Sequence, residues 1–211
     1  MTVLPSLALG FALGVRHATD ADHIAAIGTL VSDGRSARRA AYIGAAWGVG
    51  HSVSVLMVGG ALVLLRLPMP VRLALALEFA VALMLIGLGL RSLLSRGGRT
   101  HALSTARPLA VGIMHGLAGS AVLALLVLGA TTSAVAAATY LLCFCVGTVG
   151  GMALVTALLA LPAQLHPTRA VEFDRGVRVA AGVASVAIGL AMAHKIGLQD
   201  GLFGAPTQPH E

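Results

Sequence analysis

Six long apolar runs follow one another along the chain, separated by short polar or helix-breaking segments. A membrane-spanning helix needs about 20 mostly apolar residues. The runs lie near residues 3–31, 42–66, 71–94, 108–130, 134–161 and 177–198. The segments between them contain Pro68, Pro70, Gly97-Gly98 and a stretch from Pro162 to Pro167. This pattern predicts an all-α, polytopic membrane protein with six transmembrane helices.

The composition supports a membrane location for the whole chain. Hydrophobic residues make up 57% of the sequence and charged residues 10%, whereas about a quarter of the residues in a soluble domain are charged. The two cysteines, Cys143 and Cys145, lie within an apolar run and do not form a disulfide framework. We therefore expect residues 1–211 to form a single transmembrane domain in the lipid bilayer, with a disordered tail over residues 199–211.

The arginines are distributed unevenly over the connections between the runs. The connections after the first, third and fifth runs carry ten arginines, and those after the second and fourth carry two. Because short cytoplasmic loops are enriched in Lys and Arg, both termini are expected outside the cytoplasm, in a bacterial inner membrane. The net charge of +6 forms no basic stripe with interleaved aromatic residues, so nucleic acid is not an expected partner. The N-terminal run has no basic region before it, and we do not expect a cleavable signal.

Three short segments recur in order along the chain. Gly14-Val-Arg-His17 matches Gly112-Ile-Met-His115, and Trp47-Gly-Val-Gly50 matches Phe144-Cys-Val-Gly147. Ile86-Gly-Leu88 recurs as Ile188-Gly-Leu190. A repeat of three spans has opposite orientations in its two copies, as in many secondary transporters. The sequence therefore predicts an inverted repeat of residues 1–96 and 107–198.

The first run is interrupted by five ionisable residues, Arg16, His17, Asp20, Asp22 and His23. Each costs at least about 2.5–3.5 kcal/mol near the centre of a membrane helix, so such a cluster indicates function. An Arg16–Asp20 pair at i,i+4 would neutralise two of these residues and leave the other three unexplained. Imidazole and carboxylate groups together favour a divalent ion such as nickel, cobalt, zinc or iron.

A regular helix cannot direct all of these groups toward one ion. At about 100° per residue, His17, Asp20 and His23 form one inclined stripe, and Asp22 lies off it. Either the helix is broken here, as at many transporter sites, or Asp22 acts indirectly by fixing the tautomer of a histidine.

Other polar residues lie within later runs. His51 is near the middle of the second run, and His115 begins a glycine- and serine-rich patch in the fourth. His115 suits a ligand role and a structural role equally well. Glu78 in the third run is a possible gate, proton carrier or partner of Arg16. The candidate metal ligands are His17, Asp20, Asp22, His23, His51 and His115.

Two of these segments resemble the motifs of the nickel/cobalt transporter (NiCoT) family. The segment from Arg16 to Ile24 is similar to its signature, a histidine followed after four residues by Asp-His, and Gly50-His51-Ser52-Val53 is similar to its second motif. The resemblance implies a nickel or cobalt permease, with His17, Asp22, His23 and His51 at motif positions and Asp20 at a commonly acidic one. It also implies no tightly bound cofactor and no enzymatic activity.

The chain departs from the longer members of that family. Those members have eight spans and later acidic motifs, which are lacking here, and His115-Gly-Leu-Ala-Gly-Ser120 resembles the short, urease-accessory type of nickel permease instead. Three alternatives stay open. One is an acyltransferase using the His-four residues-Asp pattern of His17 and Asp22, and another is an electron-transfer protein with haem held by two histidines. The third is a metal sensor or transporter subunit without transport activity of its own.

Overall fold

The computed structural model describes residues 3–31, 36–65, 69–95, 105–130, 133–166, 168 and 170–204, and this part of the chain is helical with short turns. The helices are α1 (Val3–His17), α2 (Ala21–Val31), α3 (Ala37–Ser54), α4 (Gly60–Leu65), α5 (Val71–Leu94), α6 (Ala106–Ala130), α7 (Ala134–Leu165) and α8 (Ala170–His194). Two π-helical turns, Val55–Gly59 and Lys195–Gln199, continue α3 and α8. The predicted all-α class is confirmed.

Among the described residues, four helical segments are long and apolar enough to cross a membrane. They are Ala37–Leu62, Val71–Leu94, Val135–Leu165 and Ala170–Gln199. Three of them extend beyond the predicted runs. α7, for example, continues through Pro162 to Leu165, although proline lacks the N–H that would bond to the carbonyl four residues earlier. Its last turn closes with the His166 N–H donating to the Pro162 carbonyl at 3.1 Å.

The C-terminal segment differs from the predicted disordered tail in its first residues. Beyond the π-helical turn, the backbone N–H of Leu202 donates to the Ile196 carbonyl at 3.2 Å. The Phe203 ring then packs edge-to-face on Phe79, with ring centroids 5.2 Å apart. The chain therefore folds back onto α5, and residues 205–211 lie outside the described residues.

The first predicted span is not one helix. α1 ends at His17 and α2 begins at Ala21. The turn between them closes with the backbone N–H and hydroxyl of Thr19 both donating to the Arg16 carbonyl, at 2.9 and 2.6 Å. Of the two possibilities that the sequence left open, the structure has the broken helix.

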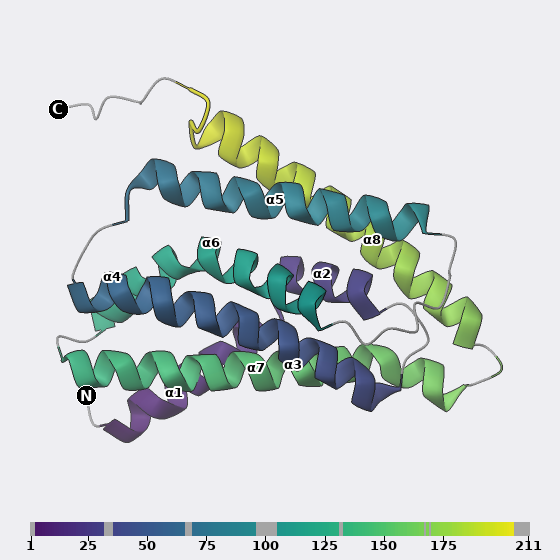
Figure 1. Cartoon of the computed structure of the whole chain (residues 1–211), viewed down its shortest axis with the longest axis horizontal. Coiled ribbons are helices and arrows are strands. Elements are labelled where there is room, and N and C mark those ends of the chain that lie inside the picture. Colours follow the sequence, from purple (N-terminus) through teal and green to yellow (C-terminus); the bar gives the residue numbers. More distant parts are fainter. Residues whose placement is uncertain are drawn as a thin grey trace.

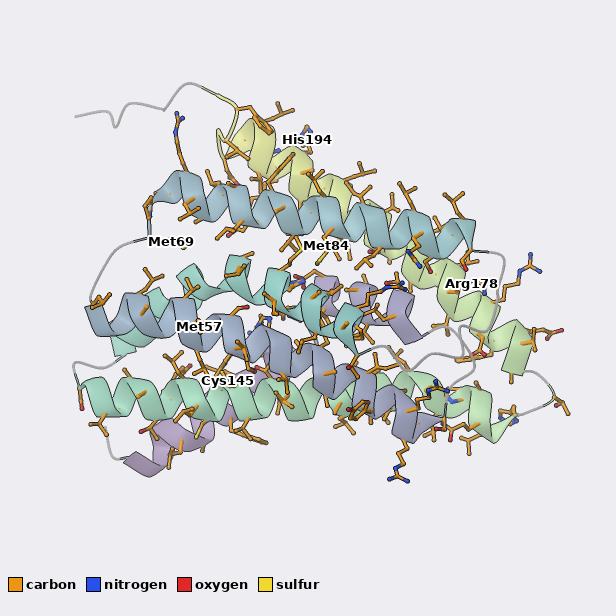
Figure 2. All side chains as sticks on the ribbon, viewed as in Figure 1. Met57, Met69, Met84, Cys145, Arg178 and His194 are labelled. Atoms are coloured by element: carbon orange, nitrogen blue, oxygen red, sulfur yellow. The ribbon has the colours of Figure 1, made fainter. Side chains whose placement is uncertain are left out.

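The helices form two groups that meet along α2 and α6. α5 and α8 pair closely along their lengths, and α1, α3, α6 and α7 pack together in the other group (Figure 1). α2 contacts both α5 and α8, and α6 also reaches α5. Met84 packs from α5 onto the shared core, which is built around buried Trp47, Leu85 and Met152 (Figure 2).

α1 and α7 run in the same direction and approach closely through small residues. Gly10 faces Tyr140, and Gly14 faces Phe144 one turn further along both helices. A Cβ at Gly14 would overlap the backbone of Phe144. Glycine is therefore needed at this position for the two backbones to pack.

α3 and α6 make an equivalent parallel contact. A Cβ at Gly112 would overlap the backbone of Trp47, and one at Gly116 would overlap His51. Ser54 on α3 donates its hydroxyl proton to the Ile113 carbonyl of α6 at 2.8 Å. Such interhelical hydroxyl bonds replace water as the partner of backbone groups inside a membrane protein.

The α5–α8 pair is antiparallel and uses the same kind of contact. The hydroxyl of Ser185 on α8 donates to the Leu85 carbonyl of α5 at 2.8 Å, and Ser92 on α5 donates to the Arg178 carbonyl of α8 at 3.2 Å. These two bonds tie the helices together at positions about two turns apart.

Candidate metal centre

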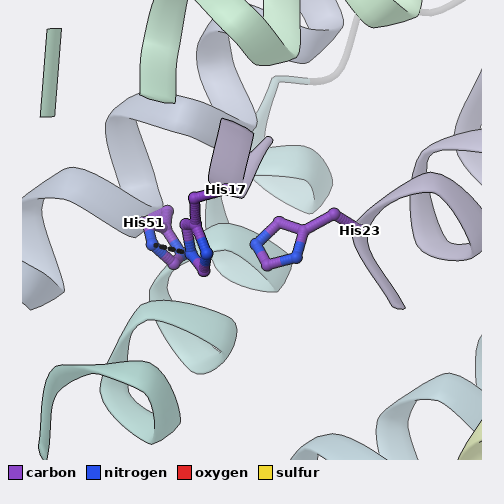
Figure 3. A group of neighbouring side chains, drawn as sticks. All are labelled: His17, His23 and His51. Carbon is purple, nitrogen blue, oxygen red and sulfur yellow. Dashed lines mark hydrogen bonds between the residues drawn. The ribbon is translucent and has the colours of Figure 1, made fainter. Parts of the chain in front are cut away.

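Three histidines from three helices converge where the first span is broken. His17 is the last residue of α1, His23 lies in the first turn of α2, and His51 lies in the last turn of α3. One ligand atom from each lies within 4.8 Å of those of the other two, and Figure 3 shows the three rings facing a common region. His23 and His51 are each 1% exposed. The break in the first span and the packing of both α1 and α3 against α7 bring these imidazoles together.

Two carboxylates in the same segment orient two of these rings. Nδ1 of His17 lies 2.9 Å from Oδ2 of Asp20, and Nδ1 of His23 lies 3.1 Å from Oδ1 of Asp22. Because a carboxylate accepts, Nδ1 is the donor in both rings, and Nε2 of each neutral ring carries the free lone pair. This carboxylate–histidine arrangement is the one found around metal-bound imidazoles.

Asp22 and Asp20 also have local structural roles in the break. Asp22 accepts the backbone N–H of His23 at 3.0 Å in the first turn of α2, where N–H groups lack helical acceptors. Asp20 pairs with His17, and Arg16 is exposed. The Arg16–Asp20 pair considered from the sequence is therefore not the arrangement in the structure.

The contact between His17 and His51 leaves a buried nitrogen unsatisfied. Their Nε2 atoms lie 3.3 Å apart, and Nδ1 of His51 is buried without a hydrogen-bond partner among the described residues. If His51 donates through Nε2, its Nδ1 lone pair is stranded. If its ring hydrogen is on Nδ1 instead, that N–H has no described acceptor and the Nε2 lone pairs of the two rings face each other. Leaving a buried polar group unsatisfied costs about 1–3 kcal/mol.

A metal ion between the rings would bind both Nε2 lone pairs and so remove their repulsion, and only the Nδ1 N–H of His51 would then lack an acceptor among the described residues. With metal–nitrogen distances of about 2.0–2.1 Å, as for zinc, neighbouring nitrogen ligands lie about 2.9–3.4 Å apart in octahedral or tetrahedral geometry. The 3.3 Å separation of the two Nε2 atoms falls within this range. Nε2 of His23 is likewise buried without a described partner. The three rings thus offer free nitrogen lone pairs at a spacing suitable for a divalent ion.

His115 on α6 lies beside this cluster. Its Nε2 is 2.8 Å from Oδ2 of Asp22, and its ring centroid is 4.3 Å from that of His23. Asp22, His23 and His115 form a second set whose ligand atoms lie within 4.8 Å of one another. The structure thus brings together all six candidate ligands. Glu78 is elsewhere, with Lys195 and Asp200 as its charged neighbours.

Two aromatic side chains line the cluster, and the sequence analysis did not assign them to the site. The Trp47 ring is fully buried, 5.3 Å from His23 and 5.9 Å from His115. The Phe144 ring lies 5.4 Å from His17. These two residues occupy matching positions in the repeated segments Trp47-Gly-Val-Gly50 and Phe144-Cys-Val-Gly147, which is the sequence signal that could have placed them together.

Comparison with known proteins identifies the family of the chain. Residues 4–105 match the family model of NicO, described as a high-affinity nickel-transport protein. The urease accessory protein UreH of Bacillus sp. (strain TB-90) is 31% identical over 220 residues, which cover 95% of this chain and 96% of that protein. The chain belongs to the NicO family of nickel-transport proteins. The resemblance to nickel permeases of the urease-accessory type is therefore confirmed.

A plant protein is a more distant relative. The chloroplast protein FOR GROWTH AND FERTILITY 2 of Arabidopsis thaliana is 27% identical over 214 residues, which cover 90% of this chain but 56% of that protein. No solved structure matches the chain. The NicO match includes both histidine motifs, and His115 lies ten residues beyond its end.

Family membership also decides between the alternatives. The family consists of transport proteins rather than enzymes, so the acyltransferase and haem interpretations are set aside. Together with the four long apolar helices, it shows that the chain is an integral membrane protein.

Proposed function

We propose that this chain is a permease for nickel or cobalt ions, and that the ion crosses the membrane through a site formed by His17, His23 and His51. The observation that carries the proposal is the convergence of three imidazoles from three separate helices, with two Nε2 atoms 3.3 Å apart. Imidazole is a common ligand for nickel and for its neighbours in the first transition row. A site shared between helices opens when the helices move apart, as transport requires.

In this proposal the two carboxylates position the ligands. Asp20 and Asp22 hold His17 and His23 in the tautomer that presents Nε2 to the ion. A carboxylate behind an imidazole also makes the ring a stronger ligand. Asp22 additionally contacts His115, so it links the three-histidine site to α6.

The depth of the site agrees with a place near the middle of the membrane. At about 1.5 Å per residue, α1 is about 22 Å long and α2 about 16 Å. The break between them therefore lies well inside a hydrocarbon core of about 30 Å if the two halves together make one crossing.

The proposed architecture is six crossings in an inverted 3+3 repeat within one transporter domain, residues 1–211. Gly14 contacts Phe144, and Gly112 contacts Trp47. Gly14 and Gly112 are 98 positions apart and Trp47 and Phe144 are 97 apart, so the two contacts join equivalent residues of the two repeats. The contact of Gly147 with Phe11 is related in the same way to that of Gly50 with Leu109. The parallel pairs α1–α7 and α3–α6, and the antiparallel pair α5–α8, have the directions that six successive crossings require.

The proposed location is a bacterial inner membrane with both termini outside the cytoplasm. The argument is the arginine asymmetry between alternate connections. In that orientation α1 and α7 both enter the membrane from the outer side, in agreement with their parallel packing.

Metal accumulation in whole cells tests the proposal. Cells expressing the wild-type chain should change their content of nickel or cobalt, measured by inductively coupled plasma mass spectrometry. Alanine at His17, His23 or His51 should abolish the change while protein levels in the membrane stay equal. His194→Ala is the matched control, since His194 is exposed at the C-terminal end of α8 (Figure 2), a helix that carries none of the candidate ligands. Wild-type accumulation in the His23→Ala protein would overturn the proposed site.

A further inference from the structure

We infer that the ion occupies two successive positions that share His23. One is the three-histidine site, and the other is formed by Asp22, His23 and His115. This inference rests on the proposed function, and it assigns to His115 the role of receiving the ion rather than of completing a single site.

His23 lies between the two groups of ligands. Its ring centroid is 4.5 Å from that of His17 and 4.3 Å from that of His115. The other members of each group come from different parts of the bundle. His17 and His51 belong to α1 and α3, whereas His115 belongs to α6.

The two nitrogens of His23 face these two groups. The distal edge of the ring, which carries Nε2, points toward His17 (Figure 3), and Nε2 is buried without a partner among the described residues. Nδ1 lies against Asp22, whose second oxygen contacts His115. When an ion leaves Nε2 of His23 together with His17 and His51, the ring hydrogen of His23 can move from Nδ1 to the vacated Nε2. Nδ1 then offers its lone pair to the ion beside Asp22 and His115.

His115 is suited to accept an ion without losing or gaining a proton. Its Nε2 contacts Asp22, and its Nδ1 is buried without a described partner. Moving the ring hydrogen from Nε2 to Nδ1 frees the Nε2 lone pair for coordination, because neutral imidazole has two tautomers. Asp22 then contributes its oxygen to the ion in place of the hydrogen bond.

The packing of α3 and α6 places His51 and His115 at about the same depth. Gly116, the residue after His115, packs against the backbone of His51. The step between the two positions therefore runs across the bundle, from the side of α1 and α3 to that of α6. His17 and His115 also occupy equivalent places in the two repeats, so a rocking motion that separates α1 from His23 can bring α6 toward it.

Binding and flux, measured separately on the purified full-length protein, test this inference. Cobalt is the probe, and Trp47, the single tryptophan of the chain, reports binding by its fluorescence because it packs on both His23 and His115. His115→Gln should keep the equilibrium cobalt affinity within about threefold of wild type, while cobalt flux into proteoliposomes falls at least about tenfold. His17→Gln should lose affinity at least about tenfold, the usual range for a disturbed metal site. His194→Gln should match wild type in both measurements.

Two results would overturn the inference and leave the permease standing. If His115→Gln loses as much affinity as His17→Gln, the four histidines form one site. If His115→Gln transports like wild type, His115 only donates a hydrogen bond to Asp22, which the glutamine amide replaces. Absence of flux in the wild-type protein would instead overturn the proposed function itself.

A second variant decides the matter if His115→Gln is not recovered in folded form. His115→Cys removes the imidazole but supplies a soft sulfur ligand, which favours cadmium. If the ion occupies two successive positions, His115→Cys should carry cadmium at least about fivefold faster than His115→Ala. Equal rates in the two variants would exclude a ligand role for position 115.

Discussion

Replacing Asp22 by asparagine is the substitution that best separates positioning from coordination. The Asp22 carboxylate accepts the His23 backbone N–H at 3.0 Å, lies 3.1 Å from Nδ1 of the same ring and 2.8 Å from Nε2 of His115. Asparagine has almost the same volume but is neutral, and it has one acceptor oxygen in place of two. The amide oxygen of asparagine can still accept from His23, whereas the amide NH₂ group now presents a donor to His115.

The expected loss follows from these contacts. A hydrogen bond to a charged group contributes about 1.5–3 kcal/mol, and one between neutral groups about 0.5–1.5 kcal/mol. Making the acceptor of the His23 ring neutral thus costs about 1–1.5 kcal/mol, and the altered contact with His115 adds a similar amount. The total of about 2–3 kcal/mol corresponds to a loss of about 30–150-fold in metal affinity, since 1.4 kcal/mol is tenfold. This range overlaps the loss of about 10–100-fold that is typical of other carboxylates behind metal-bound histidines.

The assay is equilibrium binding of cobalt or nickel to the purified protein, followed through Trp47 fluorescence. Asp200→Asn is the matched control, because Asp200 is exposed and lies next to Lys195 and Glu78 rather than the histidines. Affinity within twofold of wild type in Asp22→Asn would refute the role assigned to the carboxylate. Complete loss of binding would show that Asp22 coordinates the ion in its first position as well.

Three other predictions test the architecture and the binding of metal. Gly14→Ala and Gly112→Ala should each destabilise the protein by about 1–3 kcal/mol through overpacking, measured by thermal unfolding in detergent. Gly87→Ala, whose added Cβ meets nothing within 4 Å, should be neutral or slightly stabilising. A large difference between Gly14→Ala and Gly112→Ala would contradict their equivalence in the repeat. A C-terminal alkaline phosphatase fusion should be active and a green fluorescent protein fusion dark, and the opposite pattern would mean an odd number of crossings if the N-terminus is outside. Nickel at about 100 times its dissociation constant should stabilise the wild type by about 2.7 kcal/mol and raise its melting temperature, with no shift expected for His23→Ala.

The repeat shows where the sequence carried more information than its individual motifs. Trp47 and Phe144 recur at equivalent places, and both line the cluster. Neither residue type indicates a metal site by itself, because an aromatic ring in an apolar run packs equally well in any core. Only the joint position of the two rings, on α3 and α7, makes them part of the site.

The sequence by itself determined the helical class, the membrane location and the identities of the candidate ligands. Apolar runs of spanning length have few other solutions in lipid, since each backbone group must be paired within its own segment. Ionisable residues inside such runs are too costly to be incidental. His17, Asp22, His23 and His51 could therefore be selected without any knowledge of how the helices pack.

Tertiary structure alone decided how those ligands meet. The contact of Asp22 with the His23 ring is local, within the first turn of α2, whereas the break after His17 sets the position of the His17 ring, whose centroid lies 4.5 Å from that of His23. The contact between His115 on α6 and Asp22 on α2 joins residues 93 positions apart. Local sequence encodes the chemistry of each side chain, whereas the distances between ligands on different helices depend on packing that no single segment specifies.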